Sequence, residues 1–164
     1  MNLCIYYALH ILCVYYSLII TILKYVGVVC VWDLRSGQQI QVFQGHVKKI
    51  TTICYSPNGF QIYTCGIDNT IRVWDLRKRK CIYVIPAHNN IISDISISNS
   101  GELLVSSSFD GSVKMWGTRD FRLLGTCLGH VGRVMSVDFS SDEKSVLSVG
   151  FDRTIKMWSH KDAL

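Results

Sequence analysis

The sequence predicts an all-β protein assembled from repeated four-stranded units, and two observations support this prediction. First, three kinds of residue recur at a constant step of 42 positions. They are His46, His88 and His130; Asp68, Asp110 and Asp152; and Trp32, Trp74, Trp116 and Trp158. Second, short runs of alternating apolar residues, which are typical of strands, separate these markers. A period of about 40–45 residues that begins near Gly-His and ends at Trp predicts the blades of a β-propeller.

A hydroxyl residue stands four positions before each of these aspartates, at Thr64, Ser106 and Ser148. Each complete unit therefore carries four polar or aromatic markers at one spacing. The sets are His46, Thr64, Asp68 and Trp74; His88, Ser106, Asp110 and Trp116; and His130, Ser148, Asp152 and Trp158. Aspartate accepts hydrogen bonds, tryptophan donates them, and histidine and the hydroxyl do both. We expect each set to form a closed network, which stabilises a fold only when every member is satisfied.

The composition fits one intracellular domain with a sizeable core. Of the 164 residues, 49% are hydrophobic and 18% are charged, and the formal net charge is +5. This mild charge permits an anionic partner without requiring one. The seven cysteines contain no Cys-x-x-Cys pair, so we interpret them as reduced core residues. Because the histidines belong to the repeat, we expect no metal site and no cofactor.

The elements of a partial propeller follow in order over residues 26–164. Residues 29–43 supply the third and fourth strands of an incomplete unit. Three units follow, with second strands expected at 62–65, 103–107 and 146–149, third strands ending at the tryptophans, and fourth strands near 81–85 and 122–127. Turns begin after Ser56, Ser98 and Ser140, where Gly and Asn tolerate positive φ. After Trp158 the chain is too short and polar for a good fourth strand. We therefore expect the partner strand of this last unit to lie upstream in the sequence.

Residues 1–25 form a separate hydrophobic segment that does not fit the repeat. Residues 3–23 contain no Asp, Glu, Lys or Arg. This stretch is long enough to span a bilayer as a helix. One period upstream, the histidine, hydroxyl and aspartate positions hold Cys4, Ile22 and Val26. Three interpretations are open: a non-native replacement of missing repeats, a membrane anchor or buried apolar segment, and a strand pairing. A helix ending at Lys24 would leave few residues before the next strand, which disfavours a membrane partner.

Ser106, His88 and Asp110 are the residue types of a hydrolase triad. The same set recurs in every unit at the same spacing, whereas an active site occurs once. No nucleophile elbow, phosphate-binding loop or metal-ligand spacing accompanies it. We therefore interpret these residues as structural, and we expect no catalytic residue and no enzymatic activity.

Two further groups of residues are candidates for partner binding. Ile67, Phe109 and Phe151 each precede a turn aspartate, where they could anchor a protein partner or pack beneath neighbouring loops. Both interpretations are open. The basic residues Arg77, Lys78, Arg79 and Lys80 lie in one hairpin turn. This run could be a nuclear localisation signal or an RNA phosphate contact, although a solvated turn is favoured.

The repeated sets resemble the structural tetrads of WD-repeat proteins over most of residues 29–158. Residues 31–158 are also similar to the C-terminal propeller of a narrower family, the WD-repeat subunits of the U4/U6 small nuclear ribonucleoprotein (pre-mRNA processing factor four). The motifs that carry this likeness are Ser56-Pro57-Asn58-Gly59, Asp68-Asn69-Thr70, Ile85-Pro86-Ala87-His88, Gly129-His130-Val131-Gly132-Arg133-Val134-Met135 and Asp152-Arg153-Thr154.

The narrower resemblance implies a nuclear, non-enzymatic scaffold of the U4/U6 and tri-snRNP particles in pre-mRNA splicing. Its partners would be pre-mRNA processing factor three, a cyclophilin and the U4/U6 RNA particle. An alternative is a substrate receptor of a cullin ubiquitin ligase. For that alternative, Trp32-Asp33-Leu34-Arg35 and Trp74-Asp75-Leu76-Arg77 match the Trp-Asp-x-Arg ending that docks the cullin adaptor. A third alternative is a generic WD-repeat scaffold.

Overall fold

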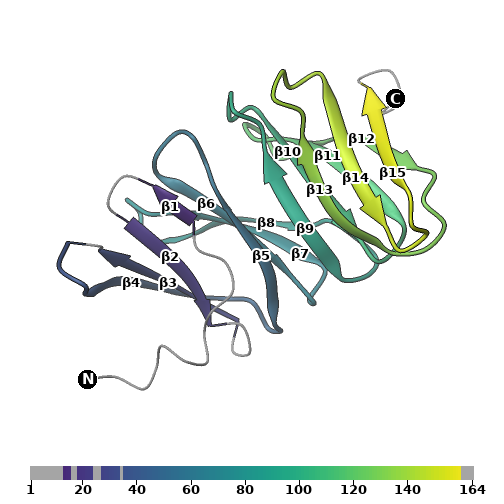
Figure 1. The fold of residues 1–164 in the computed structure, drawn as a ribbon. Helices are drawn as coiled ribbons and strands as arrows, with labels where there is room; N and C mark the ends of the chain where they lie inside the picture. The colour runs from purple at the N-terminus through teal and green to yellow at the C-terminus, as the bar shows by residue number, and fades with distance from the viewer. Residues whose placement is uncertain (1–12, 16–17, 24–26, 34, 160–164) are drawn as a thin grey trace.

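The computed structural model of the chain describes residues 13–15, 18–23, 27–33 and 35–159 (Figure 1). Within these ranges the strands form four antiparallel sheets that follow one another along the chain, and no helix occurs. Figure 1 shows the sheets stacked side by side like successive blades, from the purple N-terminal sheet to the yellow C-terminal sheet. The prediction of an all-β, partial propeller is confirmed.

Each sheet is a meander in which every strand pairs with its neighbours in sequence. The first sheet contains β1 (Cys13–Tyr15), β2 (Leu18–Leu23), β3 (Val28–Asp33) and β4 (Gln39–Gln44). The second contains β5 (Ile50–Tyr55), β6 (Gln61–Gly66), β7 (Thr70–Asp75) and β8 (Lys80–Pro86). The third contains β9 (Ile92–Ile97), β10 (Leu103–Ser108), β11 (Ser112–Gly117) and β12 (Leu123–Leu128). The fourth contains β13 (Val134–Phe139), β14 (Ser145–Gly150) and β15 (Ile155–Ser159).

The turn between the first two strands of a sheet needs a left-handed residue at one repeated position. Gly59 has φ 83° and Gly101 has φ 74°, and the fourth sheet places Glu143 there with φ 58°. Glycine adopts this conformation without the steric cost that a side chain incurs. The glycines of these two turns therefore set the hairpin geometry, and the repeat imposes the same geometry on Glu143.

The hydrophobic core lies between successive sheets. Between the first and second sheets, Val29, Val31 and Phe43 pack against a group that includes Ile50 and Trp74. The second and third sheets enclose a larger cluster: Tyr63, Cys65, Ile71, Val73, Ile85, Ala87, Ile92, Ile95, Leu104 and Trp116. Between the third and fourth sheets lie Val105, Val113, Cys127, Val134, Val137 and Val146. Each inner sheet is thus covered on both faces, which explains why its strands are more continuously apolar than half-buried strands.

Neighbouring sheets are also joined by hydroxyl groups on their first strands. Thr51 Oγ1 donates to the carbonyl oxygen of Ile92 at 2.6 Å. One repeat later, Ser93 Oγ donates to the carbonyl oxygen of Val134 at 2.7 Å. These bonds satisfy backbone groups that would otherwise be buried between sheets without a partner.

Part of the hydrophobic segment 1–25 forms strands. β2 pairs with β3 in an antiparallel register that runs from Leu18 opposite Asp33 to Leu23 opposite Val28. β1 pairs with the other edge of β2. Strand pairing is therefore the arrangement found for residues 13–15 and 18–23, while the division of the chain at residue 25 stays a prediction. The remainder of the segment, including Cys4, and the adjacent Val26 lie outside the described residues.

In the described part of the chain, no helix is long and apolar enough to cross a membrane. Cys30, Cys65 and Cys127 are buried, in agreement with the interpretation of these cysteines as core residues. Burial raises the pKa of the Cys65 thiol to about 12, which keeps this thiol protonated and unreactive.

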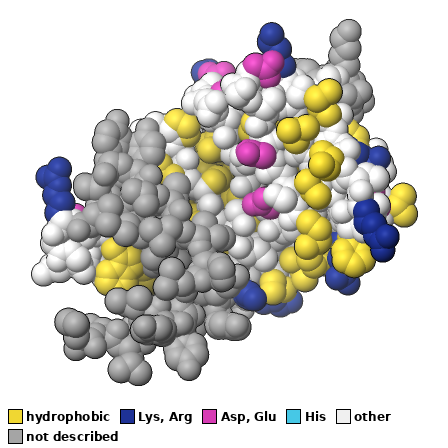
Figure 2. Space-filling view, viewed as in Figure 1, with side chains coloured by type: hydrophobic (Ala, Val, Ile, Leu, Met, Phe, Trp, Pro, Cys, Tyr) yellow, Lys and Arg dark blue, Asp and Glu magenta, His cyan; other side chains and the backbone are white. Residues whose placement is uncertain are grey.

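The fourth sheet exposes an apolar face that corresponds to buried positions in the other sheets. Leu147 pairs with Met157, and Val149 pairs with Ile155. Ile155 is 73% exposed and Met157 is 70% exposed, whereas the residues one and two repeats earlier than Ile155, Val113 and Ile71, are buried. Figure 2 shows hydrophobic side chains gathered on the side of the molecule formed by this sheet. Residues 160–164, where we expected no further strand, lie outside the described residues.

We predict that this apolar face makes the isolated chain self-associate, because contiguous exposed apolar surface drives association. Size-exclusion chromatography with light scattering should give a mass above 18.6 kDa. Ile155→Lys with Met157→Lys should shift the distribution towards the monomer. Val131→Lys, which alters an exposed apolar residue in a loop, serves as the control and should leave the mass unchanged. A monodisperse monomer of the unaltered chain would contradict the prediction.

Candidate functional site

The four markers of the second sheet meet in one hydrogen-bonded set. His46 lies in the loop before β5, Thr64 on β6, Asp68 in the β6–β7 turn and Trp74 on β7. His46 Nδ1 lies 2.8 Å from Asp68 Oδ2, and its Nε2 lies 2.7 Å from Thr64 Oγ1. Trp74 Nε1 donates to Thr64 Oγ1 at 2.8 Å. The network therefore ties the loop before the sheet to its second and third strands.

The third and fourth sheets repeat this arrangement. His88 lies 2.9 Å from Asp110 and 2.8 Å from Ser106, whose oxygen accepts from Trp116 Nε1 at 2.9 Å. His130 lies 2.9 Å from Asp152 Oδ2 and 2.8 Å from Ser148, and Trp158 Nε1 donates to Ser148 at 2.8 Å. All twelve residues selected from the sequence are thus brought together in three sets of four.

The direction of the hydrogen bonds in each set is determined by its two terminal members, the tryptophan and the aspartate. The tryptophan indole can only donate, and an ionised aspartate can only accept. The arrangement that satisfies every group therefore runs from tryptophan N–H to the hydroxyl oxygen, from the hydroxyl to histidine Nε2, and from histidine Nδ1–H to aspartate. A buried network of this kind is stabilising because it leaves no donor or acceptor without a partner.

A fifth side chain belongs to each set, and the sequence analysis missed it. Two residues after each aspartate, the hydroxyls of Thr70, Ser112 and Thr154 donate to Asp Oδ1 at 2.9, 2.6 and 2.7 Å. The backbone N–H that follows each histidine also donates to the aspartate. The signal was present in the sequence, because a hydroxyl recurs at this position with the same step of 42 residues.

These contacts set the ionisation of the network. Burial opposes ionisation of Asp68 and Asp110, but hydrogen bonds from the neighbouring histidine and hydroxyl outweigh it and lower the pKa of each carboxyl to about 2. The hydroxyl of Thr154 is the main cause of the lowered pKa of Asp152. Burial lowers the pKa of His88 despite the nearby Asp110 carboxylate. The contact of His88 with Asp110 is therefore a hydrogen bond from a neutral imidazole at neutral pH, not an ion pair.

The tetrad hydroxyls are not placed to act as nucleophiles. Thr64, Ser106 and Ser148 are fully buried. Each hydroxyl oxygen already contacts both a histidine and a tryptophan N–H. A nucleophile must reach its substrate, so this geometry fits a structural role for the Ser-His-Asp set and not a hydrolytic one.

The three apolar residues before the turn aspartates differ in exposure. Phe151 is 73% exposed, and the adjacent loop exposes Val131 to 82%. Phe109 is half-buried, with the Arg133 guanidinium carbon 5.0 Å from its ring centroid, and Ile67 is half-buried. The exposure of Phe151 fits the interpretation as a partner anchor. The position of Phe109 fits the interpretation as a residue packed beneath a neighbouring group. The sequence analysis did not single out Val131.

The basic run occupies the exposed β7–β8 turn. Arg77, Lys78, Arg79 and Lys80 are all exposed. The turn is held by the buried carboxylate of Asp75, which accepts from the backbone N–H groups of residues 77 and 78 at 2.8 and 3.0 Å. This turn lies at the opposite end of the strands from the tetrad loops, because successive strands are antiparallel. The structure therefore does not bring the basic run together with Phe109 and Phe151.

Successive antiparallel sheets, three of which carry the same tetrad, define the chain as a propeller-forming repeat protein. The family described as "WD domain, G-beta repeat" matches residues 37–75, 79–117 and 121–159. These matches cover more than half of the chain, so the chain belongs to the WD-repeat family.

Three proteins illustrate how limited the similarity to known relatives is. Protein groucho of Drosophila melanogaster is 41% identical over 46 residues, or 28% of this chain. WD repeat-containing protein 3 of Mus musculus is 37% identical over 54 residues, or 30% of the chain, and transducin-like enhancer protein 2 of Mus musculus is 39% identical over 46 residues, or 28%. Each match spans 6% of the relative's length. The shared part is therefore about one repeat.

We predict that Asp110→Ala destabilises the fold by about 1–3 kcal/mol, because it leaves buried donors on His88 and Ser112 without their acceptor. Thermal unfolding at one fixed protein concentration measures the effect. Asp120→Ala is the control, since Asp120 is an exposed aspartate of the same sheet that pairs with exposed Arg122 at 3.3 Å. Such a surface pair contributes about 0–1 kcal/mol. Equal melting midpoints for Asp110→Ala and the unaltered chain would show that the network is not stabilising.

Acidification should destabilise the fold in two stages. The folded-state pKa of His88 lies below its ordinary 6.5, so its contribution to stability is complete above pH 6.5 and is lost as the pH falls below that value. The contributions of Asp68 and Asp110 are lost as the pH falls from 3.8 towards about 2. The melting midpoint should therefore decline below pH 6.5 and fall more steeply below 3.8. His88→Gln should lose the upper stage, and a midpoint that rises on acidification would contradict the assignment.

Proposed function

We propose that the chain is a non-enzymatic protein-interaction scaffold that binds partners through the loops beside the tetrads. The observation that carries this proposal is the exposure of Phe151 and Val131 on loops that the network holds in place. Phe151 N donates to the Arg133 carbonyl at 2.7 Å, and Val131 N donates to Asp152 Oδ2 at 3.0 Å. An apolar anchor on a preorganised loop loses little conformational entropy on binding.

The polar residues of each tetrad bind one another and are therefore not available for catalysis or ligand binding. The histidine, hydroxyl and aspartate of each unit are bonded to one another, and the hydroxyls are buried. The WD-repeat fold supports many functions, and function depends on the sites displayed on it. In this chain the tetrad edge displays apolar side chains such as Phe151 and Val131 beside exposed arginines such as Arg133 and Arg153, a mixture that suits protein partners.

We further propose that the scaffold acts in the nucleus, within the U4/U6 particle of pre-mRNA splicing. The support is the sequence likeness at 85–88, 129–135 and 152–154 to the U4/U6 WD-repeat subunits. By that likeness the partners are pre-mRNA processing factor three and a cyclophilin. The net charge of +5 and the basic run 77–80 suit a ribonucleoprotein setting. The names of the three relatives do not refer to splicing, so this proposal rests on the sequence motifs.

A second candidate is the substrate receptor of a cullin ubiquitin ligase. The supporting observation is the position of Arg77, which follows Trp74-Asp75-Leu76 and has a side chain that is 65% exposed. An exposed arginine at a turn can reach a carboxylate on a docking partner.

Affinity purification of the tagged chain from nuclear extract, followed by mass spectrometry, separates these candidates. Recovery of U4/U6 proteins supports the splicing proposal. Recovery of a cullin and its adaptor supports the second candidate and contradicts the first. Recovery of neither group would overturn both and leave only the general scaffold proposal.

We predict that Phe151→Ala weakens partner capture more than neutralising residues 77–80 does. Truncating an aromatic anchor costs about 1–2 kcal/mol or more of binding free energy, whereas residues 77–80 lie at the opposite end of the strands from the tetrad loops. Phe109→Ala should have a smaller effect than Phe151→Ala, because Phe109 is half-buried beneath Arg133. Leu123→Ala, at an exposed apolar site away from the tetrad loops, is the control. If only the neutralised variant lost its partners, the tetrad loops would not be the binding surface.

A further inference from the structure

Two grooves occur at repeat-related positions, at the end of the strands opposite the tetrad loops. One groove, of about 550 Å³, lies between the second and third sheets. The other, of about 410 Å³, lies between the first and second sheets. They share six positions one repeat apart: Ile40 and Ile82, Gly59 and Gly101, Phe60 and Glu102, Leu76 and Thr118, Arg77 and Arg119, Arg79 and Phe121. Two of these pairs also share a left-handed backbone, since Gly59, Gly101, Arg79 and Phe121 all have positive φ.

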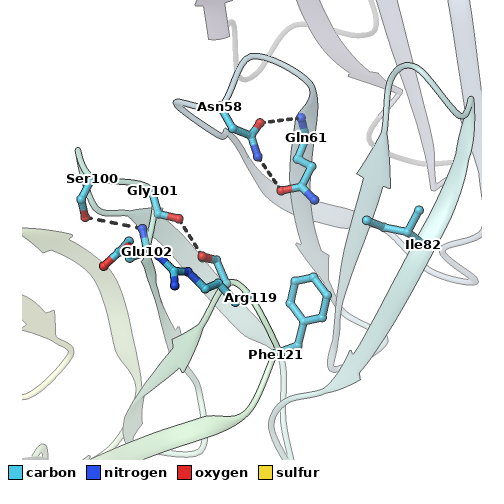
Figure 3. A pocket seen from close by; sticks show the side chains of 9 residues that line it. Asn58, Gln61, Ile82, Ser100, Gly101, Glu102, Arg119 and Phe121 are labelled. Carbon is cyan, nitrogen blue, oxygen red and sulfur yellow. Dashed lines mark hydrogen bonds and ion pairs between the residues drawn. The ribbon is translucent and has the colours of Figure 1, made fainter.

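In the groove between the second and third sheets, which we call the paired groove, polar groups satisfy one another. Arg119 donates to Glu102 Oε1 at 2.5 Å, and the Thr118 hydroxyl donates to the Gly101 carbonyl at 2.7 Å. Figure 3 shows Glu102, Arg119 and Gly101 gathered on one side of this groove, with Phe121 and Ile82 towards the other. The charge of the arginine is therefore neutralised within the groove itself.

In the groove between the first and second sheets, which we call the basic groove, three of these positions change. Phe60 replaces the glutamate, so the guanidinium of Arg77 lies 3.6 Å from the Phe60 ring centroid and forms only a longer ion pair, at 3.7 Å, with Asp75 Oδ2. Leu76 replaces the threonine, and Arg79 replaces Phe121. Among the residues that the structure describes, those lining this groove include no carboxylate. Asp75 is buried, and its Oδ1 accepts two backbone N–H groups while its Oδ2 faces Arg77.

The basic groove thus combines cations with an apolar lining. Ile40 is 49% exposed beside it, and Phe60 and Leu76 are half-buried. Arg79 is held with φ 54°, which fixes the direction in which its side chain leaves the turn. Arg77 and Arg79, both in the turn between β7 and β8, line the groove beside these apolar residues, which matches a ligand whose carboxylates neighbour an apolar side chain. Arginine binds carboxylate through paired, charge-assisted hydrogen bonds.

We propose that the basic groove binds an acidic peptide segment of a partner protein that carries an aliphatic side chain between carboxylates. Charge complementarity selects this occupant, and the volume accommodates one or a few side chains. A nucleic acid fits less well, because Arg77 covers the Phe60 ring face on which a base would stack. This surface is separate from the tetrad loops, so the chain can hold one partner at each end of its strands.

Fluorescence anisotropy of the full chain with a short labelled peptide tests this proposal. The probe carries one leucine flanked by Asp and Glu, and it is compared with a peptide whose leucine is serine and with one whose acids are amides. We expect the leucine-containing acidic peptide to bind most tightly, and we expect its binding to weaken as ionic strength rises. Equal binding of the amide peptide would overturn the proposal.

Variants locate the binding to the basic groove. Arg79→Glu should weaken binding by about tenfold, which is the loss expected for one charge-assisted contact. Arg79→Gly removes the cation while keeping the left-handed backbone, as Gly37 does at the same position one repeat earlier. Phe60→Glu should abolish binding, because the introduced carboxylate would pair with Arg77 as Glu102 pairs with Arg119 in the paired groove. These three variants should melt like the unaltered chain.

Lys144→Glu is the matched control, since it changes the net charge as Arg79→Glu does but lies in the β13–β14 turn of the fourth sheet. Equal weakening by Lys144→Glu and Arg79→Glu would show a general charge effect and overturn the proposal. A single-stranded RNA oligomer is tested in parallel. If the RNA bound in an Arg79-dependent manner and the peptide did not, the groove would be a nucleic-acid site and the peptide assignment would be wrong.

Discussion

The hydrogen-bond relay from tryptophan through a hydroxyl and histidine to aspartate is the interaction on which the rest of the fold depends. In the third sheet it joins Trp116, Ser106, His88 and Asp110, all within 2.8–2.9 Å of their neighbours. Because the two ends can only donate and only accept, the relay has one satisfied direction. In the second, third and fourth sheets it fixes the loop before the sheet against the turn between its second and third strands. The exposed loop side chains, Phe151 and Val131 among them, are positioned by that constraint.

The stacking of sheets is the second constraint, and it follows from the same period. Every sheet must cover two faces, and in the second and third sheets both faces meet a neighbour. The fourth sheet shows what an uncovered face contains, since Ile155 is exposed where its equivalents Val113 and Ile71 are buried. The chain therefore carries two kinds of surface. One is apolar, broad and shaped by stacking, and the other consists of small sites at the strand ends, where side chains vary between repeats.

Much of this architecture could be predicted from the sequence, because a constant repeat length of 42 residues places corresponding residues in equivalent environments. The four members of each tetrad and the positions of β6, β7, β8, β10, β11, β12 and β14 followed from that period. The pairing of β2 with β3 did not, because Ile22 and its neighbours lack the polar markers of the repeat. The fifth network member, Thr70, was overlooked although it recurs. The difference between the two grooves could not be read from the pattern, since it depends on which side chains meet across neighbouring turns.

The central claim is that the tetrad forms a directed, fully satisfied relay. Nitrogen-15 NMR of the histidine side chains at neutral pH tests it most directly, because the two ring nitrogens report separately on protonation. For His88 the relay requires a neutral ring with hydrogen on Nδ1 and none on Nε2, together with a slowly exchanging indole N–H on Trp116. A ring protonated on Nε2, or an indole proton that exchanges as fast as that of an exposed tryptophan, would contradict this account.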